Sequence, residues 1–252
     1  MDSKLKYIYI ITILLVVSVI NQAKGQEYSL RSLNGDGAQF QLSKNDRENI
    51  LSIIYSNDTV YVRDVEDIKI AKILNNNFLL IDYQVRAGTG MNVTKTLILA
   101  GSKNKISQSL SITSFFHEDF LDFNRQATSP MNVEVKSLDT VDLALIGDNI
   151  ENYKLRAKIH EERRSTHAPK SNYKTDAFTT LIFDKTQNIF FNSHEHISGY
   201  YTIWDPKKQE ESRQYIKGTF PVTKLGNDKY YYINHTWYKR SDKNYLTKYT
   251  YN

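Results

Sequence analysis

A two-residue alternation of apolar and polar side chains is the feature that most constrains the fold of this chain. Over residues 78–86, apolar side chains occupy every second position from Leu79 to Val85, and the same period returns over 105–113 and 153–163. Successive side chains of a strand point to opposite faces, so this period is typical of antiparallel sheets with one packed face and one wet face. We therefore expect a largely antiparallel β structure.

The expected strands follow one another without the helices of a βαβ protein, so an all-β sandwich or barrel-like meander is predicted. Residues 68–113 predict a four-stranded meander with Asn- and Gly-rich turns. Later strands are expected at about 177–184, 188–193, 199–204, 214–220, 228–233, 236–240 and 245–250. Residues 43–55 are ambiguous, because Ser43 and Asp46 could cap a short N-terminal helix or the segment could be a first strand. We favour the short helix.

The N-terminal residues have the pattern of an export signal. Two lysines precede the uncharged segment 7–20, and the small residues Ala23 and Gly25 stand before Gln26. This pattern predicts a signal peptide over residues 1–25 that is cleaved before Gln26; the alternative is an uncleaved membrane anchor. After cleavage we expect no membrane span, because no other segment is long and apolar enough.

The composition narrows the location and the chemistry further. The chain has no cysteine, which excludes disulfides and thiolate metal sites. An exported chain without cysteine is typical of bacteria, so we expect a periplasmic or extracellular protein. Without the signal peptide, 30 basic residues face 27 acidic ones, and this balance argues against nucleic acid as a partner.

We expect residues 26–252 to form a single antiparallel β domain. The alternative is two β-rich halves with a boundary near residues 114–131. In that segment four phenylalanines stand among acidic residues, and Thr128-Ser129-Pro130 follows, which favours a short helix or a loop over a strand.

His194 and His196 form the one candidate metal site of the sequence. Residues two apart on a strand share a face, so both imidazoles could bind one zinc or similar divalent ion, with an open position for a water molecule. A third ligand would have to come from elsewhere in the chain, and the available donors are His117, Glu118, Asp119 and His235. The alternative, which we favour, is a polar strand end with exposed histidines and no cofactor.

Positive charge is concentrated between residues 154 and 174, where seven Lys and Arg residues face two glutamates. Lys154, Arg156 and Lys158 alternate with apolar residues and therefore share one strand face. Such a face could bind an anionic glycan, a lipid headgroup or an acidic protein. The alternative is a solvated strand face on which lysine discourages edge-to-edge pairing.

The last fifty residues are rich in tyrosine and tryptophan. Tyr230 and Tyr232 share a face of their expected strand, and Trp237 follows in the next strand. Aromatic side chains stack on sugar rings and bind partner proteins, so these three are candidate binding residues. The alternative is a structural role in cross-strand pairs.

These observations predict an exported, non-catalytic β protein that binds a partner protein, a glycan or an anionic envelope component. A first alternative is a metal-dependent hydrolase built on His194 and His196. A second is a secreted inhibitor or assembly protein. Nucleophilic catalysis is not expected, because the sequence has neither cysteine nor a Gly-x-Ser-x-Gly motif.

Overall fold

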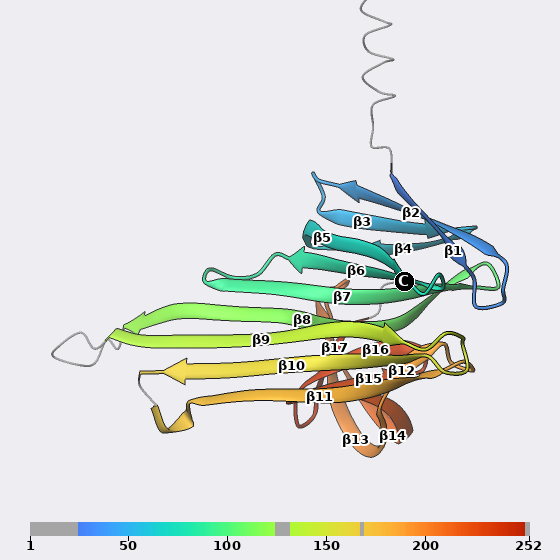
Figure 1. The fold of residues 1–252 in the computed structure, drawn as a ribbon. Coiled ribbons are helices and arrows are strands. Elements are labelled where there is room, and N and C mark those ends of the chain that lie inside the picture. Colours follow the sequence, from blue (N-terminus) through green and yellow to red (C-terminus); the bar gives the residue numbers. More distant parts are fainter. Residues whose placement is uncertain (1–24, 124–131, 167–168, 250–252) are drawn as a thin grey trace, which may run out of the picture.

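The computed structural model describes residues 25–123, 132–166 and 169–249. Within these residues it has 17 strands and one 3₁₀ turn, η1 (Pro169–Ser171). The strands form a four-stranded sheet, an eight-stranded sheet and a small closed barrel (Figure 1). The predicted all-β, antiparallel fold is confirmed, and it includes both open sheets and a barrel. Residues 1–24, which carry most of the predicted signal peptide, lie outside the described residues.

Among the described residues, no helix is long and apolar enough to cross a membrane.

The N-terminal sheet is built from consecutive antiparallel hairpins. Its strands are β1 (Gln26–Arg31), β2 (Gly37–Asn45), β3 (Ile50–Tyr55) and β4 (Asp58–Val62). Alternate residues of β2, β3 and β4 are buried and pack on residues of β6 and β7 in one hydrophobic cluster. This sheet therefore covers part of the eight-stranded sheet.

The prediction of a short helix within residues 43–55 is wrong. Ser43 belongs to β2, and residues 46–49 form the turn into β3, in which the Asn45 side chain accepts hydrogen bonds from the backbone N–H groups of Arg47 and Glu48. In β3, Leu51, Ile53 and Tyr55 are buried on one face. The apolar residues follow a two-residue period there, and pairing with β2 and β4 satisfies the backbone of the segment.

In the eight-stranded sheet, each strand pairs with its neighbours in the sequence. The strands are β5 (Val65–Leu74), β6 (Phe78–Val85), β7 (Met91–Ser102), β8 (Lys105–Phe123), β9 (Asn132–Ile146), β10 (Lys154–Ser165), β11 (Tyr173–Asp184) and β12 (Ile189–Phe191). Strands β5 to β8 confirm the meander predicted over residues 68–113. Its turns use positive φ angles at Asn75, Asn76, Lys103 and Asn104, a conformation that asparagine tolerates better than most residues.

The segment expected as a helix or loop is mostly strand where it is described. Residues 114–123 complete β8, and they pair with β7 on one side and β9 on the other. A register shift between Thr94 and Lys95 lets β8 continue past the point where its pattern breaks. Residues 124–131, the rest of the expected boundary between two halves, lie outside the described residues.

The C-terminal barrel closes through a parallel pairing of its first and last strands. Its strands are β13 (Ser193–Asp205), β14 (Glu210–Leu225), β15 (Asp228–Ile233), β16 (Thr236–Asp242) and β17 (Tyr245–Lys248). The parallel pair joins residues 202–204 of β13 to 245–247 of β17. The interior is filled by a small cluster that includes Val222, Tyr231 and Leu246.

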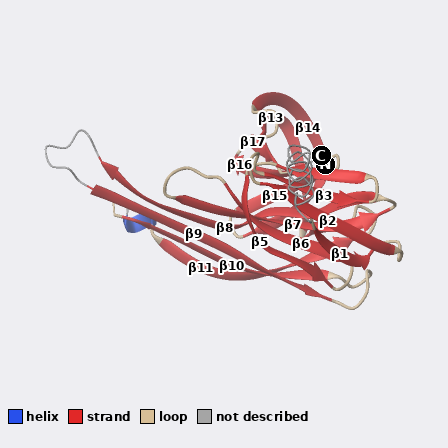
Figure 2. Ribbon diagram, turned by 90° about the horizontal axis from the view of Figure 1, so that it is seen from above, coloured by secondary structure: helices blue, strands red, loops and turns tan. Residues whose placement is uncertain are grey.

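Buried aromatic residues join the barrel to the eight-stranded sheet. The Trp237 ring is fully buried, and its indole N–H donates to the backbone oxygen of Gln108 at 2.9 Å. The hydroxyl of Tyr230 accepts the backbone N–H of Thr113 at 3.0 Å. Both rings belong to the hydrophobic cluster formed by β6 to β8, β10 to β12 and the barrel. Figure 2 shows that the long strands β8 to β11 extend away from the barrel.

Candidate functional site

Lys154, Arg156 and Lys158 of β10 form an exposed row that we call the basic stripe. The intervening residues Leu155 and Ala157 are buried in the hydrophobic cluster. Alternation along the strand therefore puts the three cations on one face, as the sequence predicts. Within the described part of the chain, none of the three makes an ion pair or a side-chain hydrogen bond.

Exposed apolar side chains flank the basic stripe on both neighbouring strands. Lys154 lies opposite Ile146 of β9 and Ile182 of β11, whereas Lys158 lies opposite Phe178 of β11 and the exposed Asp142 of β9. Residues directly opposite each other in a sheet share a face. Phe178 is 69% exposed, which is high for an aromatic residue in a sheet. These three apolar residues were not among the predicted binding residues, although the β11 segment has apolar residues on both faces.

The far end of the same face is neutralised within the sheet. The His160 ring lies 2.8 Å from the Asp176 carboxylate through Nδ1 and 3.6 Å from Glu162 through Nε2. The hydrogen bond to His160 lowers the pKa of Asp176. The face therefore changes from unpaired positive charge at residues 154–158 to an internally paired cluster at His160.

Tyr230, Tyr232 and Trp237 are buried, which corrects the expectation of an exposed aromatic binding surface. They pack in the cluster between the barrel and the eight-stranded sheet. Burial raises the pKa of Tyr230 well above its usual value. As predicted, Tyr231 lies on the opposite face of the strand from Tyr230 and Tyr232, and it packs inside the barrel. Both faces of β15 are covered, so the sheet has no wet side here.

The exposed aromatic pair of the barrel lies elsewhere, on the β13–β14 hairpin. Tyr200 and Tyr215 lie opposite each other, with ring centres 5.2 Å apart in an edge-on arrangement. They are 58% and 56% exposed. The guanidinium of Arg213 lies 5.0 Å from the centre of the Tyr200 ring. This cation–π contact holds the exposed ring in place.

His194 and His196 share the exposed side of β13, as the strand spacing predicts. The His194 ring contacts Phe191 edge-on, and Nδ1 of His196 lies 3.2 Å from the Thr219 hydroxyl. His117 is on β8 of the eight-stranded sheet, and His235 is in the β15–β16 turn. Within residues 25–123, 132–166 and 169–249, no three His, Asp or Glu side chains lie close enough together to hold a metal ion. The zinc site remains a hypothesis based on two ligands.

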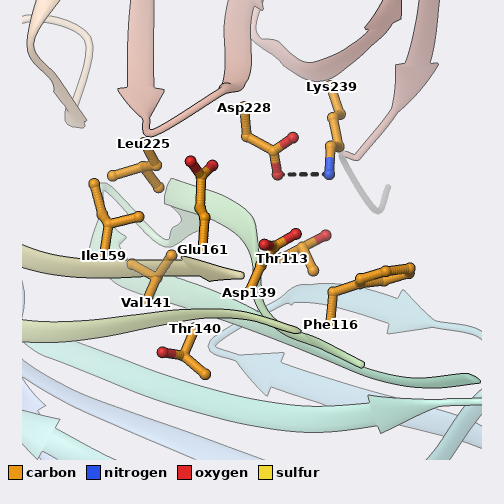
Figure 3. Close-up of a pocket in the computed structure, with 10 residues that line it drawn as sticks. All are labelled: Thr113, Phe116, Asp139, Thr140, Val141, Ile159, Glu161, Leu225, Asp228 and Lys239. Atoms are coloured by element: carbon orange, nitrogen blue, oxygen red, sulfur yellow. Dashed lines mark ion pairs between the residues drawn. The ribbon is translucent and has the colours of Figure 1, made fainter. Parts of the chain in front are cut away.

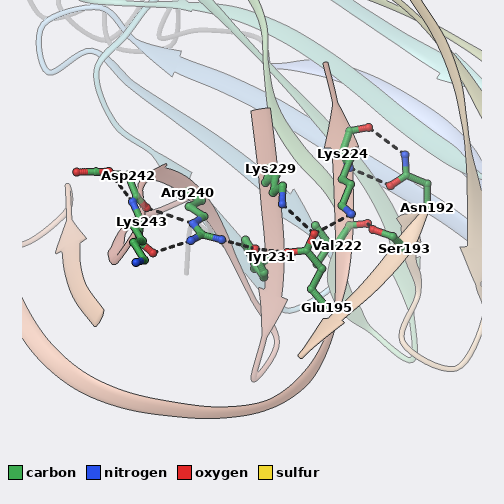
Figure 4. Close-up of polar contacts among 10 residues, drawn as sticks. All are labelled: Asn192, Ser193, Glu195, Val222, Lys224, Lys229, Tyr231, Arg240, Asp242 and Lys243. Carbon is green, nitrogen blue, oxygen red and sulfur yellow. Dashed lines mark hydrogen bonds and ion pairs between the residues drawn. The ribbon is translucent and has the colours of Figure 1, made fainter. Parts of the chain in front are cut away.

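Glu195, between the two histidines, points to the opposite side and is held by cations and a hydroxyl (Figure 4). Its carboxylate accepts hydrogen bonds from Lys224 at 2.7 Å, from Lys229 at 2.9 Å and from the Tyr231 hydroxyl. Burial alone would raise the pKa of Glu195, but these donors lower it to about 2. Partial burial and the hydrogen bond to Glu195 raise the pKa of Tyr231 to about 12. This network ties β13, β14 and β15 together.

A cavity of about 160 Å³ between the barrel and the eight-stranded sheet contains three carboxylates and one lysine (Figure 3). Glu161 accepts two hydrogen bonds from Asn227, at 2.8 Å from its backbone N–H and 3.0 Å from its side-chain amide. Asp228 pairs with Lys239 at 2.6 Å. Asp139 lies directly opposite Glu161 and has no partner for its carboxylate among the described residues. We call this the acidic cavity.

The environment of Asp139 favours its protonated form. Burial, together with the charges of Glu161 and Asp228, raises its pKa to about 6. Asp139 and Glu161 come from the neighbouring strands β9 and β10, whereas Asp228 and Lys239 come from β15 and β16 of the barrel. The cavity forms where these two strand pairs meet, so no local motif could have predicted it.

Replacing Asp139 by asparagine is expected to stabilise the protein above pH 6. The folded state binds a proton at Asp139 more tightly than the unfolded chain, so the wild type loses stability as the pH rises from about 4 to 6. Asparagine removes this cost, which we place at about 1–2 kcal/mol after allowing for solvent screening. Urea unfolding of both proteins at pH 4 and pH 8 measures the difference, which should appear only at pH 8.

The control for this experiment is Asp142→Asn on the exposed face of the same strand. It should change the free energy of unfolding by no more than about 0.5 kcal/mol. An Asp139→Asn protein that is less stable than the wild type at pH 8 would contradict the raised pKa of Asp139 in the folded state.

Comparison of the chain with protein-family models, curated proteins and solved structures gave no match.

Proposed function

We propose that this protein is an exported, non-catalytic binding protein that recognises an anionic partner through the basic stripe. The observation that carries the proposal is the unpaired state of Lys154, Arg156 and Lys158 on one exposed face. A cation that already has a carboxylate partner would lose that partner on binding, whereas these three make no ion pair among the described residues that binding would break.

The flanking apolar residues support a partner with a surface of its own rather than a free ion. Ile146, Phe178 and Ile182 give the face apolar area next to the charges. A mixed surface of this kind is typical of contacts with proteins, glycans and envelope components, in which charge directs the approach and apolar contact adds affinity. Export of the chain, which its N-terminal sequence predicts, would bring this face to such partners.

Removing the three charges is expected to weaken salt-sensitive binding to polyanions. The variant Lys154→Gln/Arg156→Gln/Lys158→Gln should elute from a heparin column at clearly lower salt than the wild type, because fewer cations displace counterions. The same proteins are then tested for sedimentation with vesicles that contain anionic lipid. Comparing the two results distinguishes a glycan partner from a membrane surface.

A matched control removes the same charge elsewhere. Lys103, Lys105 and Lys217 are also exposed, and their combined replacement by glutamine changes the net charge equally. The proposal requires this control to elute close to the wild type. Equal losses in both variants would mean that net charge alone causes retention. Phe178→Ser then measures the apolar contribution, and we expect it to weaken binding to a partner protein more than retention on heparin.

A further inference from the structure

A second cavity, of about 140 Å³, opens where the N-terminal sheet, the eight-stranded sheet and the barrel meet. Its lining comes from the end of β4 and the connection that follows it, from β6 and β7, and from the β13–β14 turn and β17. Five cationic side chains line it: Arg63, Arg86, Lys95, Lys207 and Lys248. We call it the cationic cleft. Only the folded chain assembles it, because these residues span most of the described sequence.

Two acidic residues, Asp64 and Asp205, also line the cationic cleft. Asp205 already has partners within the protein. The Asp205 carboxylate accepts the backbone N–H of Lys207 at 3.0 Å and lies 3.3 Å from the ammonium of Lys248. Although burial opposes it, the charge of Lys248 keeps the pKa of Asp205 below its usual value. Asp205 therefore neutralises Lys248, and the lining as a whole keeps an excess of positive charge.

Arg63 and Arg86 have no carboxylate partner among the described residues. In the described ranges, neither the Arg63 nor the Arg86 side chain makes an ion pair or a hydrogen bond. Their segments are nevertheless tied together, because the backbone N–H of Arg86 donates to the backbone oxygen of Asp64 at 3.2 Å. Guanidinium groups bind oxyanions with two parallel hydrogen bonds, so two arginines at one cavity form a fitting recognition pair.

We propose that the cationic cleft binds a small oxyanion, a phosphate, sulfate or carboxylate group, through Arg63 and Arg86. The volume of the cleft fits one such group with a few waters rather than a polymer chain. Tyr61, which is 52% exposed, forms a wall on which a ring attached to the anion can stack. The Lys95 ammonium lies 4.3 Å from the centre of the Tyr249 ring and contributes to the positive field of the site.

This site is separate from the basic stripe of β10, so the two proposals can be tested independently. The purified protein is titrated with inorganic phosphate, sodium sulfate and sodium acetate at constant ionic strength, and backbone amide shifts are followed by NMR. We expect saturable shifts at residues 61–64, 85–86, 205 and 207–208 for at least one anion. The variant Arg63→Gln/Arg86→Gln should weaken that binding about tenfold or more. The three anions decide which oxyanion the cleft prefers.

The controls distinguish the cleft from general attraction by positive charge. Both arginines are exposed, so the double variant should unfold at the same urea concentration as the wild type. The variant Lys154→Gln/Arg156→Gln/Lys158→Gln should bind the anion as well as the wild type does. No saturable shift with any of the three anions would overturn the proposal, as would equal binding by the arginine double variant.

Discussion

Replacing Trp237 by alanine is expected to lower the free energy of unfolding by about 3–5 kcal/mol, the usual cost of removing a fully buried large aromatic side chain. Trp237 is 0% exposed and lies between the barrel and the eight-stranded sheet. The change also leaves the backbone oxygen of Gln108 without the indole N–H that it accepts at 2.9 Å. Urea unfolding followed by far-UV circular dichroism measures the effect.

Tyr200→Ala is the control for Trp237→Ala in the same barrel. The Tyr200 ring is 58% exposed and contacts Tyr215 and Arg213. Its loss should cost no more than about 1 kcal/mol, because little apolar surface leaves the core. Similar costs for the two variants would show that the Trp237 ring is not the main contact between barrel and sheet.

Replacing Glu195 by glutamine is expected to destabilise the protein by about 2 kcal/mol at pH 7. The pKa of Glu195 is lowered from about 4.5 to about 2 in the folded state, so ionised Glu195 favours folding. The expected loss in free energy of unfolding is smaller than the whole pKa shift would give, because Lys224 and Lys229 are 41% and 37% exposed and partly screened by solvent. Glutamine can still accept a hydrogen bond from a lysine, but it has no negative charge to pair with the two ammonium groups.

The pH dependence distinguishes this effect from simple loss of packing. Because the folded pKa is lowered, the contribution is complete above about pH 4.5 and is lost as the pH falls towards 2. Unfolding of wild type and variant is therefore compared at pH 7, 4 and 2.5, and the gap should narrow across the series. Glu210→Gln, which removes an exposed pair with Lys208, should cost no more than about 0.5 kcal/mol at pH 7. A gap that stays constant with pH would rule out the ionic explanation.

Local sequence patterns predicted many of the strands and the faces of their side chains, but not the strands within residues 43–55 and 114–123. The period of two predicted the β5–β8 meander, the exposure of Lys154, Arg156 and Lys158, and the separation of Tyr230 from Tyr231. The short helix was mispredicted because Ser43 and Asp46 resemble a helix cap, whereas the pairing of β3 with two strands decided the outcome. Whether the basic stripe binds a partner stays a prediction.

The sequence by itself determined that the chain is antiparallel β, because alternation follows from the geometry of a single strand. The tertiary structure decided which faces are covered, and packing of the barrel on the sheet turned Tyr232 and Trp237 from candidate binding residues into core residues. It also decided where unpaired charges meet. The acidic cavity exists only because β9 and β10 meet β15 and β16 of the barrel, and the cationic cleft only because segments from β4 to β17 come together. No local period records such contacts.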